Sequence, residues 1–366
     1  MKQKIKVVLG MSGGVDSSVA AYLLKKQGYE VIGYFMNCGV RGKTMWPSSI
    51  DWKEDERVVR EICKKLKIEL RMADCEIGYE KKIIGPMFED YKKGLTPNPD
   101  ILCNNIGKFP NLMKIAEEIG ADYIATGHYA RIKRTKRGAE LLMSRDRKKD
   151  QSYFLCGLDK KILEKCLFPI GDYKKEEIRE IAKRNKFLNW NKRGSRGICY
   201  LGKIDMKKFM RQRIVKIEGN VLSTDGEIVG THSGSVFFTI GERVKDKDGF
   251  ILNKKFRKRY AGKKLYVAEK LSENKLVVAS EGDKRLFRKE VLLKDFKLID
   301  KDEKVDVKKF KARIRHLGEF NSGKLKKEKS RWIFTFDNGV EGVAEGQFLV
   351  LYQGERVVGC GEIRFR

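Results

Sequence analysis

Apolar residues recur at two different spacings along the first half of the chain. Short apolar runs at residues 4–10, 30–36 and 68–72 predict buried strands. Between these runs, residues 15–26 and 51–66 carry apolar side chains three or four positions apart, which predicts helices that bury one face. Short strands that alternate with helices are typical of a parallel sheet covered on both faces. We therefore expect a doubly wound α/β domain in this part of the chain.

The same alternation continues to about residue 126. Residues 79–93 and 112–119 have helical spacing, and residues 123–126 form another apolar run that predicts a strand. Pro86 lies inside the first of these helices and has no backbone N–H to donate. We expect that helix to kink or break near the proline.

The pattern changes after about residue 203. Residues 205–216 predict one last helix, and helix-length periodicity is absent beyond them. Short strands with turn pairs follow, the pairs being Asp225-Gly226, Asp248-Gly249, Glu281-Gly282 and Asn338-Gly339. This pattern predicts an all-β part made of small barrels or sandwiches, and 366 residues leave room for two or three domains.

The charge of the chain narrows the choice of function. Lysine and arginine total 80 against 50 aspartates and glutamates, which gives a formal net charge of +30. This balance excludes an ordinary neutral metabolic enzyme as the default and favours a polyanionic partner, most commonly nucleic acid. Three strongly basic stretches, at residues 131–149, 243–264 and 301–331, fit a long anionic ligand. The alternative is that they are solvated loop tips.

Neither a membrane anchor nor a structural metal site is predicted. No stretch reaches about 18 apolar residues, and the N-terminus reads directly into a strand without a signal or transit segment. We expect a cytoplasmic protein with reduced thiols. No two cysteines form a C-x-x-C pair and there are three histidines, which argues against zinc or an iron–sulfur cluster. Most cysteines should be core residues, namely Cys38, Cys63, Cys75, Cys156, Cys166 and Cys360.

The first chemical motif is the loop between the first strand and the first helix. It reads Gly10-Met11-Ser12-Gly13-Gly14-Val15-Asp16-Ser17-Ser18. Small residues let backbone N–H groups approach a phosphate, and the start of the helix adds the positive end of its dipole. Asp16 is expected to hold magnesium or to cap the helix. The run matches neither the Walker pattern nor the dinucleotide-binding pattern.

This loop resembles that of the PP-loop ATP pyrophosphatases, which bind ATP and activate a carbonyl oxygen as an adenylate. Four further runs resemble the tRNA-specific 2-thiouridylases, the MnmA family. They are G-L-T-P-N-P-D-I-L-C-N at 94–104, T-G-H-Y-A-R at 126–131, D-Q-S-Y-F-L at 150–155 and S-R-G-I-C-Y-L-G at 195–202. The resemblance spans the chain and is densest from residue 10 to residue 202.

The resemblance implies an architecture and an activity. It implies a PP-loop catalytic domain at residues 1–204, a small central tRNA-binding domain at 205–275 and a C-terminal β-barrel domain at 276–366 that contacts tRNA. The implied reaction is 2-thiolation of the wobble uridine of tRNA, with ATP and Mg²⁺ as cofactors. The implied partners are tRNAs for Lys, Glu and Gln and a protein persulfide that donates sulfur.

The resemblance also implies roles for single residues. Cys199 carries the persulfide, Cys103 is the second catalytic thiol and forms a disulfide with it, and Asp100 is the general acid or base. The implied ATP-binding residues are Gly10, Met11, Ser12, Gly13, Gly14, Val15, Asp16, Ser17, Met36 and Gly127. The implied tRNA-binding residues are Asn98, Pro99, Asp100, His128, Lys149, Asp150, Gln151, Arg313, Ile314 and Gln347.

Two other functions share part of this pattern. A PP-loop ligase that acts on a small molecule would have the phosphate loop, but the charge of +30 and the placing of Cys103 and Cys199 argue against it. A non-catalytic RNA-binding protein would have the charge, but the intact S-G-G-V-D-S-S run argues against it.

Overall fold

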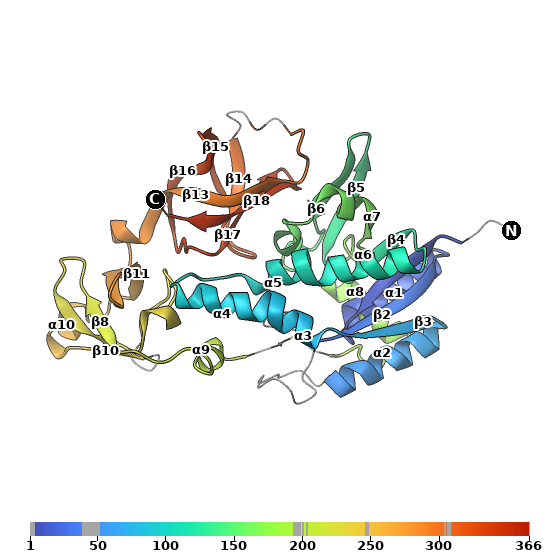
Figure 1. The fold of residues 1–366 in the computed structure, drawn as a ribbon, viewed down its shortest axis with the longest axis horizontal. Helices are drawn as coiled ribbons and strands as arrows, with labels where there is room; N and C mark the ends of the chain where they lie inside the picture. The colour runs from blue at the N-terminus through green and yellow to red at the C-terminus, as the bar shows by residue number, and fades with distance from the viewer. Residues whose placement is uncertain are drawn as a thin grey trace.

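A computed structural model provides the fold of the chain (Figure 1). It describes residues 4–38, 52–192, 199, 201–202, 204–245, 249–303, 305 and 309–365. Within these ranges, no helix combines the length and the apolar character that crossing a membrane requires.

A five-stranded parallel sheet forms the centre of the N-terminal part. Its strand order is β3-β2-β1-β4-β7, and every neighbouring pair in it is parallel. The doubly wound sheet expected from the alternating pattern is therefore confirmed. The strands are β1 (Lys6–Met11), β2 (Glu30–Asn37), β3 (Glu69–Asp74), β4 (Tyr123–Thr126) and β7 (Cys166–Leu167).

Helices cover both faces of this sheet because alternate strand residues point to opposite sides. Val7 and Leu9 of β1 pack with helices α1, α2 and α8, whereas Val8 between them packs with α4 and α6 on the other face. These helices are α1 (Val15–Lys26), α2 (Trp52–Leu66), α4 (Gly85–Lys92), α6 (Phe109–Glu118) and α8 (Lys175–Arg184).

The break expected at Pro86 takes the form of a widened turn. The segment begins as α3 (Glu76–Tyr79), passes through the π-helical turn η1 (Glu80–Ile84), and continues as α4. Pro86 lies in the first turn of α4, where its missing N–H costs least. The helical path therefore continues past the proline with a change of hydrogen-bond register.

A second five-stranded sheet follows in the central part, with the order β10-β9-β8-β12-β11. Its neighbouring strands are antiparallel except for the pair β8 and β12. The predicted helix at 205–216 is shorter, α9 (Met206–Met210), and the expectation that it is the last helix is wrong. The additional helix α10 (Lys254–Arg259) begins where the Asn253 side chain accepts the N–H of Phe256. Its six residues bury only Phe256, so they give no periodic signal. The strands are β8 (Gly219–Leu222), β9 (Ile228–His232), β10 (Phe250–Leu252), β11 (Leu265–Leu271) and β12 (Lys275–Ser280).

The C-terminal part is a closed barrel, as the turn-rich pattern predicts. Six strands follow one another in the order β13-β16-β15-β14-β17-β18, and β13 pairs with β18 to close the ring. A core that includes Phe310, Leu325 and Phe334 fills the barrel. The strands are β13 (Phe287–Leu298), β14 (Lys309–Arg313), β15 (Asn321–Glu328), β16 (Arg331–Glu341), β17 (Phe348–Gln353) and β18 (Arg356–Arg364).

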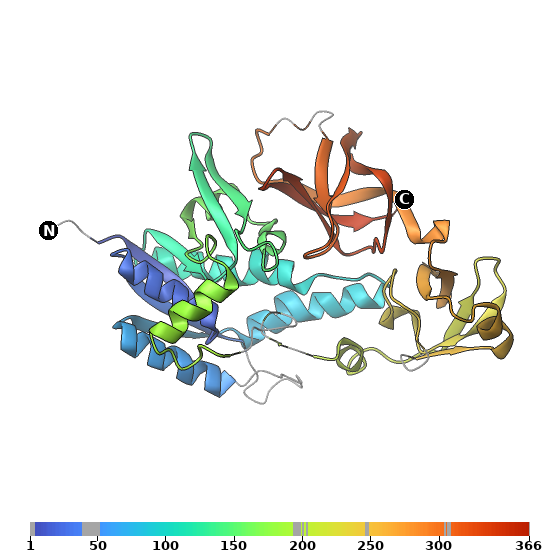
Figure 2. The same cartoon turned by 180° about the vertical axis from the view of Figure 1, so that it is seen from behind.

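A hairpin joins the N-terminal part to the barrel. Strands β5 (Ala130–Thr135) and β6 (Gly138–Met143) leave the N-terminal part, and β6 pairs with β18 through Leu142 and Arg356 (Figure 2). A buried ion pair lies beside this junction. Nη1 of Arg313 on β14 donates to Oδ2 of Asp150 over 3.0 Å, and both side chains are buried.

Replacing Arg313 tests how strongly this junction is held. Arg313→Met should lower the free energy of unfolding by about 3–5 kcal/mol, because Asp150 would keep a buried negative charge without its partner. Urea unfolding followed by tryptophan fluorescence measures the loss. Lys311→Met on the same strand is the matched control, since Lys311 is exposed, and it should change stability by less than about 0.5 kcal/mol. Equal stability of the two variants would contradict the conclusion that the ion pair between Arg313 and Asp150 stabilises this junction.

Candidate active site

The phosphate loop follows β1 at the carboxyl edge of the parallel sheet. Gly13 has φ +70°, and a Cβ there would lie 2.8 Å from the backbone of Asp55, so this position requires glycine. Gly14 is the N-cap of α1 and, having no side chain, cannot itself cap the first N–H groups of the helix. The hydroxyls of Ser12 and Ser17 lie 3.2 Å apart beside them. The Ser17 hydroxyl also donates to the carbonyl of Gly14 over 3.1 Å. The first N–H groups of a helix have no partner within the helix, so this end of α1 is suited to bind an anion.

Two other segments hold this loop in place. The Asn189 amide donates to the carbonyl of Gly13 and to the hydroxyl of Ser18, both over 3.0 Å. Gly127, just after β4, lies so close to α1 that a Cβ would be 2.7 Å from the amide nitrogen of Ser17. The loop therefore sits between the ends of β1 and β4, where the strand order reverses and open α/β sheets bind ligands.

Asp16 does not cap the helix, since Gly14 is the N-cap. Its Oδ1 accepts hydrogen bonds from the hydroxyl of Tyr129 over 2.9 Å and from Nζ of Lys175 over 2.5 Å. The Lys175 side chain is only 10% exposed. A buried cation thus lies next to the phosphate loop, and Asp16 supplies its counter-charge.

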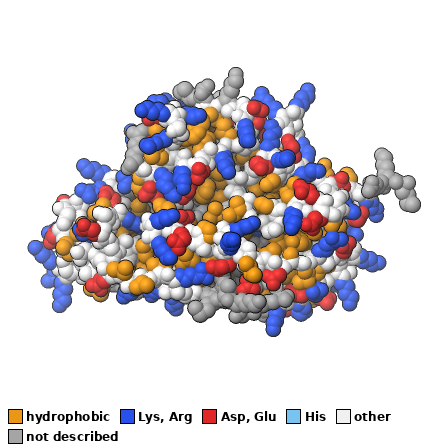
Figure 3. All heavy atoms as spheres, viewed as in Figure 1, with side chains coloured by type: hydrophobic (Ala, Val, Ile, Leu, Met, Phe, Trp, Pro, Cys, Tyr) orange, Lys and Arg blue, Asp and Glu red, His pale blue; other side chains and the backbone are white. Residues whose placement is uncertain are grey.

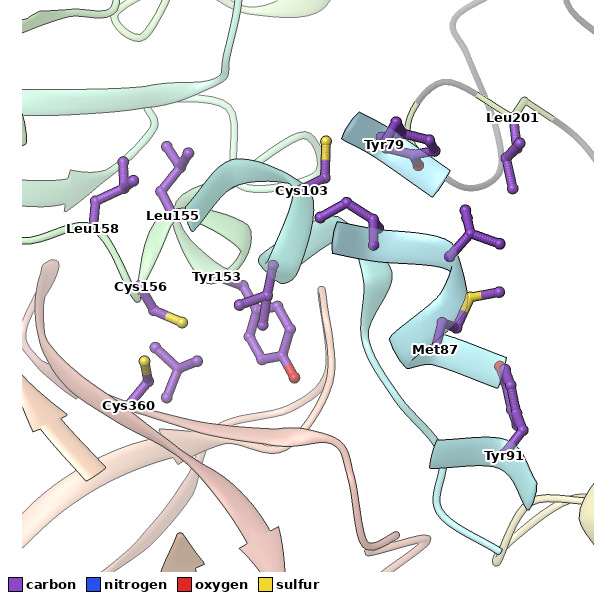
Figure 4. Packing of buried hydrophobic residues seen from close by; sticks show 14 of the residues in the cluster. Tyr79, Met87, Tyr91, Cys103, Tyr153, Leu155, Cys156, Leu158, Leu201 and Cys360 are labelled. Atoms are coloured by element: carbon purple, nitrogen blue, oxygen red, sulfur yellow. The ribbon is translucent and has the colours of Figure 1, made fainter. Parts of the chain in front are cut away.

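The two cysteines singled out in the sequence come together beside Asp100. Cys103 donates to the sulfur of Cys199, with 3.5 Å between the two Sγ atoms. Oδ1 of Asp100 accepts the backbone N–H of Cys199 over 2.7 Å. The hydroxyl of Tyr79 donates to the backbone carbonyl of Cys199 over 2.5 Å. Figure 4 shows Cys103 with its sulfur on the side of Tyr79. Both backbone polar groups of Cys199 are therefore held by side chains, one from α5 (Pro99–Leu102) and one from α3.

The surroundings make the two thiols unequal. The hydrogen bond to Cys199 and burial raise the pKa of the Cys103 thiol well above its ordinary value. The same hydrogen bond lowers the pKa of the Cys199 thiol, and the positive charge of Lys108 acts in the same direction. Burial raises the pKa of Asp100. Cys199 therefore loses its proton more readily than Cys103.

The loop that carries Asp100 is held by the barrel. The Asn98 side chain caps α5 (Pro99–Leu102) by accepting the N–H of Ile101, and it donates to Oε1 of Gln347 over 3.3 Å. Gln347 donates in turn to the carbonyl of Thr96 over 2.9 Å. Gly346 has φ +90°, and a Cβ there would lie 2.9 Å from the backbone of Thr96. The predicted tRNA-binding residues Asn98 and Gln347 thus contact each other.

Lys108 and His128 extend the site towards β4. Cys103 begins the π-helical turn η2 (Cys103–Lys108), and Lys108 ends it. Nζ of Lys108 lies 3.5 Å from Nε2 of His128, whose Nδ1 lies 2.8 Å from the Thr126 hydroxyl. Sequence reasoning missed Lys108 because a single lysine carries no signal in a chain of net charge +30.

The other predicted binding residues lie in different environments. Lys149 is exposed, whereas Asp150, Arg313 and Ile314 are buried at the junction with the barrel. Oε1 of Gln151 accepts the N–H of Tyr129 over 2.9 Å. Their contacts with tRNA stay predictions. The other buried residues among those predicted to bind ATP or tRNA are Met11, Gly13, Val15, Ser17, Met36 and Pro99.

The cysteines predicted to be core residues are mostly buried, and four of them form two further pairs. Cys38 and Cys75 directly follow the ends of β2 and β3, and each influences the pKa of the other. Cys156 of the N-terminal part faces Cys360 of the barrel, and Figure 4 shows their sulfur atoms pointing toward each other. Cys63 and Cys166 lie in the core, and Cys75 is half-buried.

The basic stretch at 243–264 contains a defined surface helix. Helix α10 exposes Lys254, Lys255 and Lys258, while Phe256 is buried and packs on Tyr260 with ring centroids 4.5 Å apart. The aromatic residues of this stretch therefore anchor the helix and leave its cations in solvent. Figure 3 shows lysine and arginine side chains over much of one face, including the tip formed by the central sheet.

Three family models match consecutive parts of the chain. A tRNA methyl transferase HUP domain matches residues 5–203, a tRNA methyl transferase PRC-barrel domain matches 207–281, and an aminomethyltransferase beta-barrel domain matches 288–363. A solved 4-thiouridine synthetase–RNA complex with bound ATP is similar over 57% of this chain and 50% of its own, with 19% identity and a TM-score of 0.36.

Full-length relatives have one name in common. The tRNA-specific 2-thiouridylase MnmA of Christiangramia forsetii is 33% identical over 98% of this chain and 99% of its own length. MnmA 1 of Geobacillus kaustophilus is 36% identical over 99% and 96%, and MnmA of Malacoplasma penetrans is 36% identical over 98% of each chain. With matches of this identity and coverage, the chain belongs to the tRNA-specific 2-thiouridylase family, MnmA.

Proposed function

We propose that the protein is an ATP-dependent tRNA-uridine 2-sulfurtransferase that thiolates the wobble uridine. The observation that carries this proposal is the pairing of Cys103 and Cys199, 3.5 Å apart beside Asp100. This pair lies at the same edge of the sheet as the phosphate loop, because Lys108 of the site contacts His128 at the end of β4. Family membership supports the same reaction.

The phosphate loop is suited to activate the uridine. Replacing the C2 oxygen by sulfur requires a better leaving group, and an adenylate on that oxygen supplies one. The uncapped N-terminus of α1 and the hydroxyls of Ser12 and Ser17 would bind the phosphates of ATP. Asp16 would lie beside a magnesium ion that is held mainly by these phosphates.

The unequal thiols are suited to deliver the sulfur. A persulfide on Cys199 attacks C2 as an anion, AMP leaves, and a C2–S–S–Cys199 adduct forms. Cys103 then loses its proton and attacks the Sγ of Cys199. The sulfur at C2 departs from Cys199 with the electron pair, and a Cys103–Cys199 disulfide remains. Asp100, which contacts Cys199, would handle the proton.

A direct assay tests the proposed function. The protein is incubated with tRNAs for Lys, Glu and Gln, ATP, magnesium and a persulfide donor, and the nucleosides are measured by mass spectrometry. We expect 2-thiouridine at the wobble position only when all components are present. Pyrophosphate release without thiolated product would indicate a different nucleophile and would contradict sulfur transfer.

Substitution of each cysteine should stop turnover at a different step. Cys199→Ser should accept no sulfur, because the persulfide carrier is missing. Cys103→Ser should still carry a persulfide on Cys199 but should not complete turnover. Peptide mass spectrometry measures both states, and Cys63→Ala, which removes a buried thiol of α2, is the control that should retain activity. Product formation with Cys103 and Cys199 both free, and no reductant present, would contradict the two-cysteine scheme.

Removal of Asp16 should separate catalysis from stability. Asp16→Ala should abolish thiolation, because the phosphates lose a positioning group, and should cost about 1–3 kcal/mol, because Lys175 loses its partner. Asp16→Ala combined with Lys175→Met should regain most of this stability without regaining activity. Urea unfolding and the nucleoside assay give the two readouts. Normal turnover by a folded Asp16→Ala protein would refute the role of Asp16.

The exposed lysines of α10 should contribute to tRNA affinity. The logarithm of the affinity should fall linearly with the logarithm of salt, by about 0.7–0.9 per phosphate neutralised. Replacing Lys254, Lys255 and Lys258 by alanine should reduce this slope by about 2–3, with unchanged ATP affinity. Fluorescence anisotropy with labelled tRNA measures the slope.

A second triple variant controls for net charge in this salt experiment. Lys26, Lys53 and Lys64 are exposed on α1 and α2, and replacing all three by alanine removes the same charge from a different surface. The control should leave the slope unchanged. If the two triple variants have the same slope as the unmodified protein, the lysines of α10 are merely solvated.

A further inference from the structure

Lys108 places a positive charge at the end of the turn that begins with Cys103. The turn η2 is π-helical, so its backbone hydrogen bonds join residues five positions apart. This register brings Lys108 back over the position of Cys103, one turn later. Turns of π-helix are uncommon in proteins, and those that occur lie frequently at functional sites. Lys108, which ends this turn, is therefore a candidate functional residue.

Two side-chain contacts hold the Lys108 ammonium group. Nζ donates to Oδ1 of Asn104 over 3.2 Å and lies 3.5 Å from Nε2 of His128. Cys103 begins the turn that Lys108 ends, and its sulfur lies 3.5 Å from that of Cys199. The ammonium group is therefore held beside the cysteine pair, where its charge acts on Cys199.

His128 is suited to accept from a cation. Burial and the charge of Lys108 lower the pKa of His128 well below its ordinary value, so the ring is neutral at physiological pH. The Thr126 hydroxyl lies 2.8 Å from Nδ1, and the ring stacks on Phe109 with centroids 5.8 Å apart. A neutral ring with Nδ1–H towards Thr126 presents an acceptor at Nε2 to Lys108.

Two opposing effects act on the charge of Lys108. Burial by itself lowers the pKa of Lys108, but the electrostatic effect of Cys199, followed by that of Cys103 and Asp100, raises it above its ordinary value. Conversely, the charge of Lys108 favours the anionic form of Cys199. The cation and the thiolate therefore stabilise each other.

We propose that Lys108 is a positioning residue of the sulfur-transfer site, which holds the sulfur of Cys199 as an anion both as a thiolate and as a persulfide. This inference rests on the proposed function for its persulfide stage. The thiolate stage can be tested without ATP or tRNA. A persulfide reacts as an anion, so a fixed cation beside Cys199 would keep the terminal sulfur reactive at neutral pH.

The experiment measures the alkylation of Cys199 by iodoacetamide as a function of pH in the full-length protein. Peptide mass spectrometry separates Cys199 from the other cysteines. Lys108→Gln removes the charge and keeps an amide for Asn104 and His128, and Lys108→Arg keeps the charge. Lys114→Met on α6 is the matched control, since its side chain is 76% exposed.

We expect Lys108→Gln to move the alkylation midpoint of Cys199 upward by about one pH unit or more. The rate below both midpoints should fall roughly tenfold, because fewer molecules carry the thiolate. Lys108→Arg should recover most of the rate, and Lys114→Met should match the unmodified protein. An unchanged midpoint in folded Lys108→Gln would overturn the proposal, and so would a loss that Lys108→Arg does not recover.

A second measurement keeps the test independent of the proposed function and of folding. Urea unfolding midpoints show whether Lys108→Gln is folded. If it is not, the alkylation midpoint of Cys199 in Lys108→Arg is compared with that in Lys114→Met. A charge effect predicts similar midpoints in these two variants. A lysine with a purely structural role predicts a large shift of the midpoint in Lys108→Arg. Failure of the unmodified protein to thiolate tRNA, with the Cys199 midpoint still dependent on Lys108, would reject the proposed function alone.

Discussion

The hydrogen bond from the amide of Cys199 to the carboxylate of Asp100 is the contact on which the site depends. It joins two segments 99 positions apart, and together with the bond from Tyr79 it satisfies both backbone polar groups of Cys199. The sulfur of Cys199 is thereby held beside that of Cys103. The hydrogen bond between them lowers the pKa of the Cys199 thiol and raises the pKa of the Cys103 thiol. Reactivity at this site is a property of the pair.

The barrel takes part in this arrangement from a distance. Gln347 bridges Asn98 and the carbonyl of Thr96, and the amide of Thr96 donates to the carbonyl of Glu345 over 2.7 Å. The loop before Cys103 therefore has its backbone fixed by the C-terminal domain. The barrel therefore helps to set the position of the loop that carries Asp100.

Local patterns predicted the parts of the fold that depend on near neighbours. The bounds of α1 and β4 match the predicted ranges, because helical and strand spacing report which face of an element is buried. The pairing of Arg313 with Asp150 depends on residues 163 positions apart, which no local pattern reports. Lys108 was missed for a related reason, since nothing in its sequence surroundings distinguishes a half-buried lysine of a site from a solvated one. Cys103 and Cys199 were found through motif resemblance alone.

The hairpin β5–β6 has a consequence for how the molecule can be divided. One side of β6 pairs with β5, and the other meets β18 of the barrel, where the amide of Met143 also donates to the carbonyl of Glu355. A catalytic part separated from the barrel would expose this edge, with unpaired N–H and C=O groups ready to pair with another chain. Backbone hydrogen bonds thus cross the boundary between the two family domains, and a barrel taken from a relative would have to present the same strand edge to β6.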